Sequence, residues 1–436
     1  MPPTAGPSLR EWVLAALGRY WSRSAEPIRR LPIPEVSPPA VVRLPPLLRT
    51  VRLPPWAMDA AVDGGLLIPA ECIGPAGPAG PAGAEDWRHT DWLAAAAWYL
   101  DGTAERAHER THGPIHSYAV RLRGWDPRLW DRAWVNRIAL FLRRWAAREL
   151  GGDEPDRLGP LPEPRILITH DVDAVHKTLA LRAKHAAFGG YRTVRALRRG
   201  GVRAAGAEVA RSVRFVSSGG DYRQFERIVR LESEAGVRST FFVYAGPPGP
   251  WRLPRQALLD PSYAPDANGL SAQWRHLLER GWSIGLHASF DSWADPRQLR
   301  RQRERLETVL GSPATSCRQH WLRFSWSDTW AAQAAAGLSE DMTLGFNDRP
   351  GFRNGAALRM RPHASGTGTV EVVPMVLMDS HLYDYRDFDE ADRAAQIARW
   401  IAEVRAVGGE ASVLWHQRVL SDDYGWSEGF RRLLEA

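Results

Sequence analysis

The chain has few cysteines and lacks a long apolar run. Its 436 residues include only two cysteines, Cys72 and Cys317, so neither a disulfide framework nor a cysteine-based zinc site is supported. No segment approaches the roughly 18 apolar residues that a membrane-spanning helix needs. The apolar stretch near the N-terminus is too short for a signal peptide, and Ser8 with Glu11 predicts a capped helix there instead. We therefore expect a cytoplasmic protein.

The composition is otherwise that of a globular protein long enough for two domains. Hydrophobic residues make up 44% of the chain and charged residues 25%. Twenty tryptophans are unusual. Such large rings are mostly core residues, but they also stack on sugars, so the count raises a carbohydrate hypothesis without deciding it.

The formal net charge of +7 is concentrated in one segment. Residues 176–220 hold ten Lys or Arg against one acid, Glu208, which leaves 47 basic and 49 acidic residues elsewhere. One interpretation is a solvated helical face rich in arginine. The other is a patch that attracts phosphates of a sugar nucleotide, a lipid-linked glycan or anionic lipid, which includes peripheral membrane contact. We expect no nucleic-acid partner, because no recognition module accompanies the charge.

Residues 1–160 differ in their sequence pattern from the rest of the chain. They contain Pro-rich stretches and "GPAGPAGPAG" at 74–83, which we interpret as a loop or linker. Helices are predicted through "DWLAAAAWYL" and from Asp126, as cap, to Gly151. We predict an N-terminal accessory module, helical or mixed with Pro/Gly-rich linkers, over 1–160 and a catalytic domain over 161–436.

From residue 161 onward, predicted strands alternate with predicted helices. Such alternation implies an α/β fold with a parallel sheet, either a barrel or an open doubly wound sheet. We favour a barrel or incomplete barrel, because polar residues fall repeatedly at the C-terminal ends of strands. The predicted strands are "RILIT", "STFFVY", "WSIGLH", "TVEVVPMVLMD" and "ASVLWH".

Two carboxylates follow the first of these strands, in the stretch "ILITHDVDAVH". Asp171 and Asp173 lie two residues apart on extended backbone, so both side chains point to the same side. Two close carboxylates repel each other unless a cation lies beside them, so one is predicted to bind a metal and the other to act as a base. The alternative is that one acid caps the following helix. A cap does not account for the second acid, nor for the flanking His170 and His176.

Ligand-type side chains also end other predicted strands. "WSIGLH" finishes on His287, and Asp291 follows four residues later, a spacing that brings both groups to one face of a helical turn. "SVLWHQ" carries His416, and "CRQHW" offers Arg318 and His320. These side chains are expected to meet at one mouth of the barrel.

The residue types predict metal-assisted hydrolysis of an amide or ester. Asp171 would take the proton from a water molecule whose pKa a bound cation lowers. His416 would protonate the leaving group, and Arg318 would hold Asp171 ionised. The predicted metal ligands are Asp173, His287 and Asp291.

The motifs, in this order, resemble those of the polysaccharide deacetylases, carbohydrate esterase family four, whose best-known type is the nodulation chitooligosaccharide deacetylase. "THDVD" is similar to the family motif Thr-Phe-Asp-Asp with one residue inserted, so Asp171 matches the base and Asp173 the metal ligand. "HASFD" stands where the family has His-Ser/Thr-x-x-His, with Asp291 in the place of the second histidine. The resemblance covers residues 165 to about 420. It implies a distorted parallel barrel that removes acetyl groups from N-acetylated sugars.

Three further motifs carry the resemblance. "RQHW" takes the place of Arg-x-Pro-Tyr, which maps Arg318 and Trp321, and the backbone amide at Trp321 would be an oxyanion donor. "MVLMD" supplies Asp379 as the acid of the fourth motif, and "LWH" matches Leu-x-His, with Leu414 for the acetate pocket and His416 as the acid. "RQHWLRFSW" also resembles a bacterial subgroup that has "HDVD" and an N-terminal module. The implied substrate-binding residues are Trp321, Leu414, His320 and Arg323.

The implied cofactor is one divalent metal ion. Zn is expected first, and the oxygen-rich set that Asp291 creates leaves Mn, Fe, Co or Mg open. The leading hypothesis is a deacetylase of an N-acetylated sugar or glycan precursor, with or without a phosphate, in cell-surface polysaccharide metabolism. The alternatives are a cytoplasmic hydrolase of cyclic amides or ureides in the same superfamily and a non-catalytic glycan-binding relic.

Overall fold

The computed structural model of the chain describes residues 7–37, 39–75, 86–198, 200–247, 254–267, 269–363 and 366–436. Most of the "GPAGPAGPAG" stretch lies outside these described residues. By its internal contacts the chain divides into two compact units, whereas the domain boundary at residue 160 stays a prediction. Unit 1 comprises Met1–Leu167, Asp291–Arg301 and Thr315–Val413, and unit 2 comprises Ile168–Phe290, Gln302–Ala314 and Leu414–Ala436.

The strands fall into two sheets in the part of the chain that the structure describes. They are β1 (Leu48–Arg52), β2 (Gly65–Pro69), β3 (Arg165–Val172), β4 (Thr240–Tyr244), β5 (Ser283–Ala288), β6 (Ser316–Gln319), β7 (Glu340–Asp341), β8 (Glu371–Val372), β9 (Met375–Met378) and β10 (Glu410–Leu414). Strands β1 and β2 form an antiparallel pair, and the other eight form one sheet in the order β8-β7-β6-β5-β4-β3-β10-β9.

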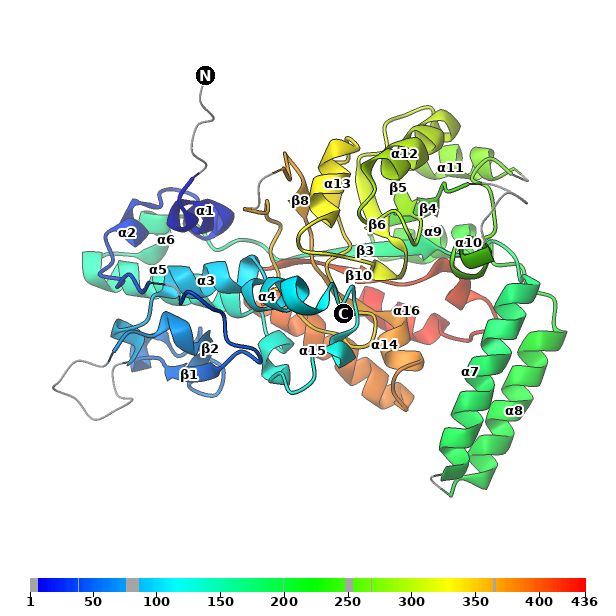
Figure 1. The fold of residues 1–436 in the computed structure, drawn as a ribbon, viewed down its shortest axis with the longest axis horizontal. Helices are drawn as coiled ribbons and strands as arrows, with labels where there is room; N and C mark the ends of the chain where they lie inside the picture. The colour runs from blue at the N-terminus through cyan, green and yellow to red at the C-terminus, as the bar shows by residue number, and fades with distance from the viewer. Residues whose placement is uncertain are drawn as a thin grey trace. The chain divides into compact units, whose positions relative to one another are not determined.

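The order of the eight strands is that of a parallel (β/α) barrel opened between β8 and β9. Neighbours follow the chain from β3 to β8, and β10 and β9 lie on the other side of β3. The pairs β3–β4, β4–β5, β6–β7 and β7–β8 are parallel. The predicted α/β fold with an incomplete parallel barrel is confirmed by this strand order. Strands β3 to β6 are labelled in Figure 1.

One predicted strand was wrong. "TVEVVPMVLMD" forms two short strands, β8 and β9, on either side of Val373 and Pro374. Proline has no N–H to donate to a sheet, so a continuous strand is interrupted there. The break has a topological consequence, because β8 and β9 lie at opposite ends of the strand order.

The N-terminal part of unit 1 has helices around the small β1–β2 sheet. Ser8 Oγ accepts a hydrogen bond from the Glu11 N–H at 3.3 Å, so the predicted cap is present. The helix predicted from Asp126 to Gly151 begins instead as a 3₁₀ turn, Pro127–Trp130, before α5 starts. The helices of unit 1 are α1 (Leu9–Ala16), α2 (Glu26–Arg29), α3 (Trp92–Leu100), α4 (Thr103–His112), α5 (Trp134–Leu150), α6 (Glu154–Leu158), α13 (Thr329–Ala335), α14 (Asp379–Tyr383) and α15 (Glu390–Ala406).

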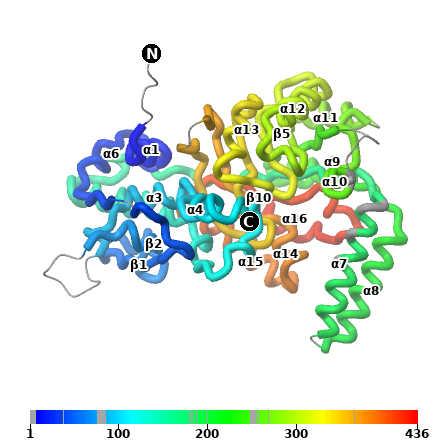
Figure 2. Tube along the Cα trace, in the orientation of Figure 1, coloured from blue at the N-terminus to red at the C-terminus, as the bar shows by residue number. Residues whose placement is uncertain are grey.

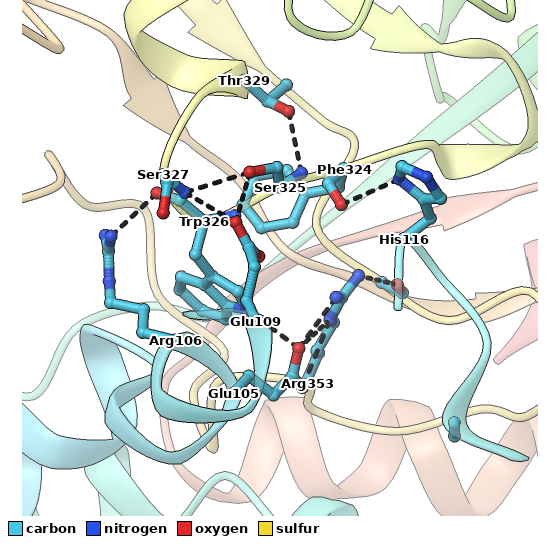
Figure 3. Close-up of polar contacts among 12 residues, drawn as sticks. Glu105, Arg106, Glu109, His116, Phe324, Ser325, Trp326, Ser327, Thr329 and Arg353 are labelled. Carbon is cyan, nitrogen blue, oxygen red and sulfur yellow. Dashed lines mark hydrogen bonds and ion pairs between the residues drawn. The ribbon is translucent and has the colours of Figure 1, made fainter. Parts of the chain in front are cut away.

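Helix α4 is joined to the segment that follows β6 by several hydrogen bonds (Figure 3). Glu105 accepts from Arg353 Nη2 and from Trp326 Nε1, both at 2.8 Å. Glu109 accepts from the Trp326 backbone N–H at 3.0 Å, and Arg106 donates to the Trp326 carbonyl at 2.8 Å. The ion pair between Arg353 and Glu105 is almost fully buried. Residues from the N-terminal region therefore position the loop that carries several predicted substrate-binding residues.

Unit 2 contains the strands β4 and β5 and most of β3. Apart from their first residues, β4 and β5 are buried, as is typical of parallel strands that are covered on both faces. Helices α7 and α8 form an antiparallel pair inserted between β3 and α9 (Figure 2). The helices of unit 2 are α7 (Leu179–Arg198), α8 (Val202–Ser217), α9 (Phe225–Glu234), α10 (Pro254–Leu259), α11 (Leu270–Glu279) and α16 (Ser427–Glu435), while α12 (Pro296–Leu310) has residues in both units.

Most of the tryptophans are core residues. Fifteen of them are buried in the described ranges, including Trp274, Trp282 and Trp415 of unit 2. Their number therefore reflects packing more than an exposed surface for stacking sugars. None of the helices in the described ranges is at once long and apolar enough to cross a bilayer.

Candidate functional site

The end of β3 directs its side chains to two faces of the sheet. Side chains alternate along a strand, so Asp171 and Asp173 share one face while His170 lies on the other. Asp171 stands opposite Phe242 of β4 and is only 4% exposed. Asp173 follows the last residue of the strand and is partly exposed.

His287 lies next to both carboxylates. It is buried in β5, opposite Tyr244 of β4. Its Nε2 atom is 3.2 Å from Asp173 Oδ1 and 3.9 Å from Asp171 Oδ2. The structure thus brings together one imidazole and two carboxylates that the sequence had placed on two separate strands.

The second oxygen of Asp173 faces two basic side chains that follow β10. His416 Nε2 lies 3.5 Å from Asp173 Oδ2, and Arg418 Nη1 donates a hydrogen bond to the same oxygen. Gln417 donates to the carbonyl of Ala174, which holds this turn beside the end of β3. Sequence reasoning missed Arg418. The available signal was its position two residues after His416.

A second polar group lies on the opposite face of β3 and is fully buried. His170 Nδ1 lies 2.5 Å from the Trp415 carbonyl oxygen, and Nε2 lies 2.8 Å from Glu232 Oε1. Both of these partners are hydrogen-bond acceptors, so a ring nitrogen that carries a hydrogen donates to the partner beside it. Glu232 also accepts from Ser239 Oγ at 2.8 Å and from Trp282 Nε1 at 2.5 Å. His170 is therefore a structural residue.

Tyr263 joins the ends of β3 and β4 next to the carboxylates. Its hydroxyl donates to the Val172 carbonyl and accepts from the Tyr244 N–H, both at 2.8 Å. Burial, together with the negative charges of Asp173 and Asp171, raises the pKa of Tyr263 well above its usual value. The phenol therefore remains a neutral donor and keeps the two strand ends in register.

Two of the three predicted metal ligands, Asp173 and His287, lie together in unit 2. Atoms that share one tetrahedral Zn at about 2.0–2.2 Å lie a little over 3 Å apart, and the 3.2 Å between Asp173 Oδ1 and His287 Nε2 is of that size. Imidazole and carboxylate donors suit Zn, Co or Fe. Asp291, the third predicted ligand, is half-buried and belongs to unit 1. Its role as a ligand stays a prediction, as does the substrate-binding role of His320.

Three other predicted residues are buried at or beside strand ends. Arg318 of β6 donates through Nη2 to Ser412 Oγ at 3.4 Å, and Asp379, the first residue of α14, accepts from the Ser380 N–H at 2.6 Å. Leu414 is the last residue of β10. The catalytic roles of Arg318 and Asp379 and the acetate-pocket role of Leu414 stay predictions.

The loop after β6 has an unusual backbone. Trp321 and Leu322 both have positive φ, at 58° and 48°, which is uncommon for residues other than glycine and often accompanies functional sites. The Trp321 carbonyl accepts from Ser117 Oγ at 2.8 Å and from Asn347 Nδ2 at 2.9 Å. Partners from two other parts of unit 1 thus stabilise the conformation.

Arg323 of the same loop is held by a neutral histidine. Its Nη2 donates to His116 Nε2 at 2.9 Å, while His116 Nδ1 donates to the Phe324 carbonyl at 3.2 Å. Burial and the neighbouring Arg323 lower the pKa of His116 to about 4. The imidazole therefore stays uncharged near neutrality and can accept from the guanidinium.

Comparison with known proteins gives matches among solved structures only. No protein-family profile and no curated protein matches the chain. A provisionally assigned polysaccharide deacetylase from Mycobacterium smegmatis is 19% identical, with a TM-score of 0.36 over 63% of this chain and 84% of that chain. A family 4 acetyl xylan esterase from Clostridium thermocellum, in complex with a cobalt ion, is 12% identical, with a TM-score of 0.25 over 62% and 83%. A chitin deacetylase from Colletotrichum lindemuthianum is 15% identical, with a TM-score of 0.23 over 58% and 87%. The function proposed for this chain depends on its own side chains.

Proposed function

We propose that the protein is a metal-dependent hydrolase that removes an acetyl group from an N-acetylated sugar or glycan precursor. The observation that carries the proposal is the placement of Asp171 and Asp173 on one face of β3, with the buried His287 next to both. Asp173 is the closer of the two to the imidazole and suits a metal ligand. Asp171, farther away and more buried, suits a base.

Each remaining polar group would then have a separate task. A bound divalent ion supplies positive charge that lowers the pKa of water and polarises a carbonyl. Asp171 would take the proton from the attacking water, and His416 would donate a proton to the departing nitrogen. Because Arg418 donates a hydrogen bond to Oδ2 of Asp173, the other carboxylate oxygen, Oδ1, would remain directed at His287. The residues of unit 2 that would hold the ion are Asp173 and His287.

Metal analysis combined with acetate release tests the proposal. The purified full chain is assayed for bound metal, loaded with Zn or Co, and incubated with an N-acetylated chitooligosaccharide. We expect Asp171→Asn to lower acetate release by about 10²- to 10⁴-fold while the metal content is unchanged, because only the base is lost. The exposed Asp221 provides a matched control, and Asp221→Asn is expected to keep both properties.

Three results would contradict the proposal. Full activity in Asp171→Asn would remove that residue from the role of base. A wild-type protein that binds glycan but holds no metal and hydrolyses no substrate would be a non-catalytic relic. Hydrolysis of hydantoin without release of acetate from sugars would move the protein to the cyclic amide and ureide hydrolases.

We further propose a cytoplasmic location and a precursor that carries a phosphate. The support for the phosphate is the excess of positive charge in residues 176–220, directly after the carboxylate pair in the chain. A higher kcat/KM for a nucleotide-linked acetamido sugar than for the free sugar is the expected result. Equal values would contradict the role of the phosphate.

A further inference from the structure

Helices α7 and α8 are the antiparallel pair drawn in green in Figure 1. They expose an unusual number of large apolar side chains. Seven such residues have relative exposures that run from 38% at Val216 to 73% at Val202. Soluble proteins rarely expose contiguous apolar patches of this kind unless something binds to them. The seven residues are Tyr191, Val194, Leu197, Val202, Val209, Val213 and Val216.

The exposed apolar residues follow helical spacing on each helix. The four valines of α8, spaced by seven, four and three residues, form one stripe, and the three residues of α7 recur every third position. The faces between the two helices are occupied by other residues. Gly189 faces Ser212 so closely that a Cβ at residue 189 would collide with Ser212 Oγ, and Ala205 and Phe215 of α8 are buried. The apolar stripes are therefore not the core of this helical pair.

The charge of the pair is almost entirely positive. Residues 176–220 contain ten basic residues and one acid, Glu208. That acid is already paired with Arg192 at 3.4 Å and with Arg211 at 2.9 Å. The segment contains no other acid, and Arg203 and Arg214 are exposed.

Basic and apolar side chains are interleaved rather than separated. Arg195 follows Val194 and Arg198 follows Leu197 in the chain. The centre of a protein interface is depleted in charged residues, whereas a helix that lies on an anionic bilayer combines an apolar stripe with flanking Lys or Arg. Long arginine side chains can reach the headgroups while aliphatic neighbours enter the acyl region. The pattern favours a lipid surface over a protein partner.

The base of the helical pair is attached to the segment that carries His416 and Arg418. Lys177 Nζ, almost fully buried, donates to the Phe215 carbonyl at 2.8 Å and pairs with Asp423 at 2.7 Å. Tyr424 packs against the Phe215 ring, with 5.5 Å between their centroids. The helices are thus fixed at their base to the polypeptide that follows β10.

We propose that the α7–α8 pair is a docking element for an anionic lipid bilayer. In this proposal the helical pair lies on the surface of the bilayer. The valine stripe of α8 and the exposed face of α7 enter the interfacial region of the membrane, and the arginines contact the lipid headgroups. The proposal does not depend on the hydrolase activity. If the docking proposal fails, the proposed hydrolase activity can still be tested, and the reverse also holds.

Vesicle flotation with the full chain tests the docking proposal. The vesicles are phosphatidylcholine alone or phosphatidylcholine with about 30% phosphatidylglycerol. We expect binding to the anionic vesicles only, and weaker binding as salt is added. Val209→Ser with Val213→Ser is expected to weaken binding about tenfold or more, and Arg203→Gln with Arg214→Gln about 25-fold, since each cation contributes about fivefold.

Controls separate docking from loss of fold and from self-association. Val120 is an exposed valine outside the helical pair, and Val120→Ser should bind vesicles like the wild type. Circular dichroism checks that every variant is folded. Absence of binding to anionic vesicles, or wild-type binding by both double variants, would overturn the proposal. So would a dimer in light scattering that the valine variant dissociates, with no vesicle binding, because the apolar stripes would then be covered by a second copy.

Discussion

The buried contact between His170 and Glu232 leads to a prediction of stability whose size follows from the hydrogen bonds. Glu232 accepts from His170 at 2.8 Å, from Ser239 at 2.8 Å and from Trp282 at 2.5 Å. Glu232→Leu fills a similar volume but leaves three buried donors without their acceptor. Each unsatisfied donor costs about 1–3 kcal/mol, and removing one partner of a buried pair costs about 3–5 kcal/mol. We expect the free energy of unfolding to fall by about 3–5 kcal/mol.

The matched variant Glu232→Gln separates the charge from the hydrogen bonds. The amide oxygen can accept from Ser239 and Trp282, and the amide N–H can donate to Nε2 of a neutral His170. Nδ1 of that ring keeps its contact with the Trp415 carbonyl. Every group then has a partner, so we expect a loss of about 1 kcal/mol or less.

Urea titrations followed by circular dichroism measure both variants against the wild type. The midpoints should shift strongly for Glu232→Leu and little for Glu232→Gln, with similar slopes. Equal losses in the two variants would show that the negative charge, and not the number of hydrogen bonds, stabilises the site. A leucine variant as stable as the wild type would refute the reasoning altogether.

Two further predictions concern Arg418, which contacts a predicted metal ligand, and the buried His381. Arg418 donates to Asp173, so Arg418→Leu should weaken binding of Zn or Co by about 10- to 100-fold in calorimetry, and unchanged affinity would remove Arg418 from this orienting role. Burial lowers the pKa of His381 from 6.5 to about 4, so only the unfolded chain gains a proton as the pH falls from about 6.5 to about 4, and stability should decrease by up to about 3 kcal/mol over that window. His381→Asn, which can still accept from the Met378 N–H, should show a shallower pH dependence in urea titrations, and an unchanged slope would speak against His381 as the titrating group.

The class of fold could be predicted because it depends on patterns that are local in the sequence. Apolar strands alternating with amphipathic helices determine a parallel sheet wherever they occur along a chain. The boundaries of helices and strands depend on the backbone chemistry of single residues, which such patterns do not describe. Pro374 divides one apolar run into two strands at opposite ends of the strand order, and the helix expected from Asp126 starts late because a 3₁₀ turn intervenes.

The candidate site could be predicted only in part, for a different reason. The proximity of Asp171, Asp173 and His287 follows from alternation and from the rule that strand ends meet at one edge of a parallel sheet. The third predicted ligand, Asp291, depended on the spacing of a helical turn, which periodicity does not establish, and it stays a prediction. Periodicity cannot find Arg418 either, because its side chain is directed by a turn.

The titratable residues at the end of β3 are explained by the two faces of one strand. His170 and Asp171 are adjacent, so their side chains must lie on opposite faces. On one face Glu232 and the Trp415 carbonyl hold His170, which fixes the position of the strand end. The same constraint places Asp171 and Asp173 beside His287 on the other face. Because the strand connects the two groups, a loss of hydrogen bonds at Glu232 should also disturb metal binding, whereas the hydrogen-bonded glutamine should preserve it.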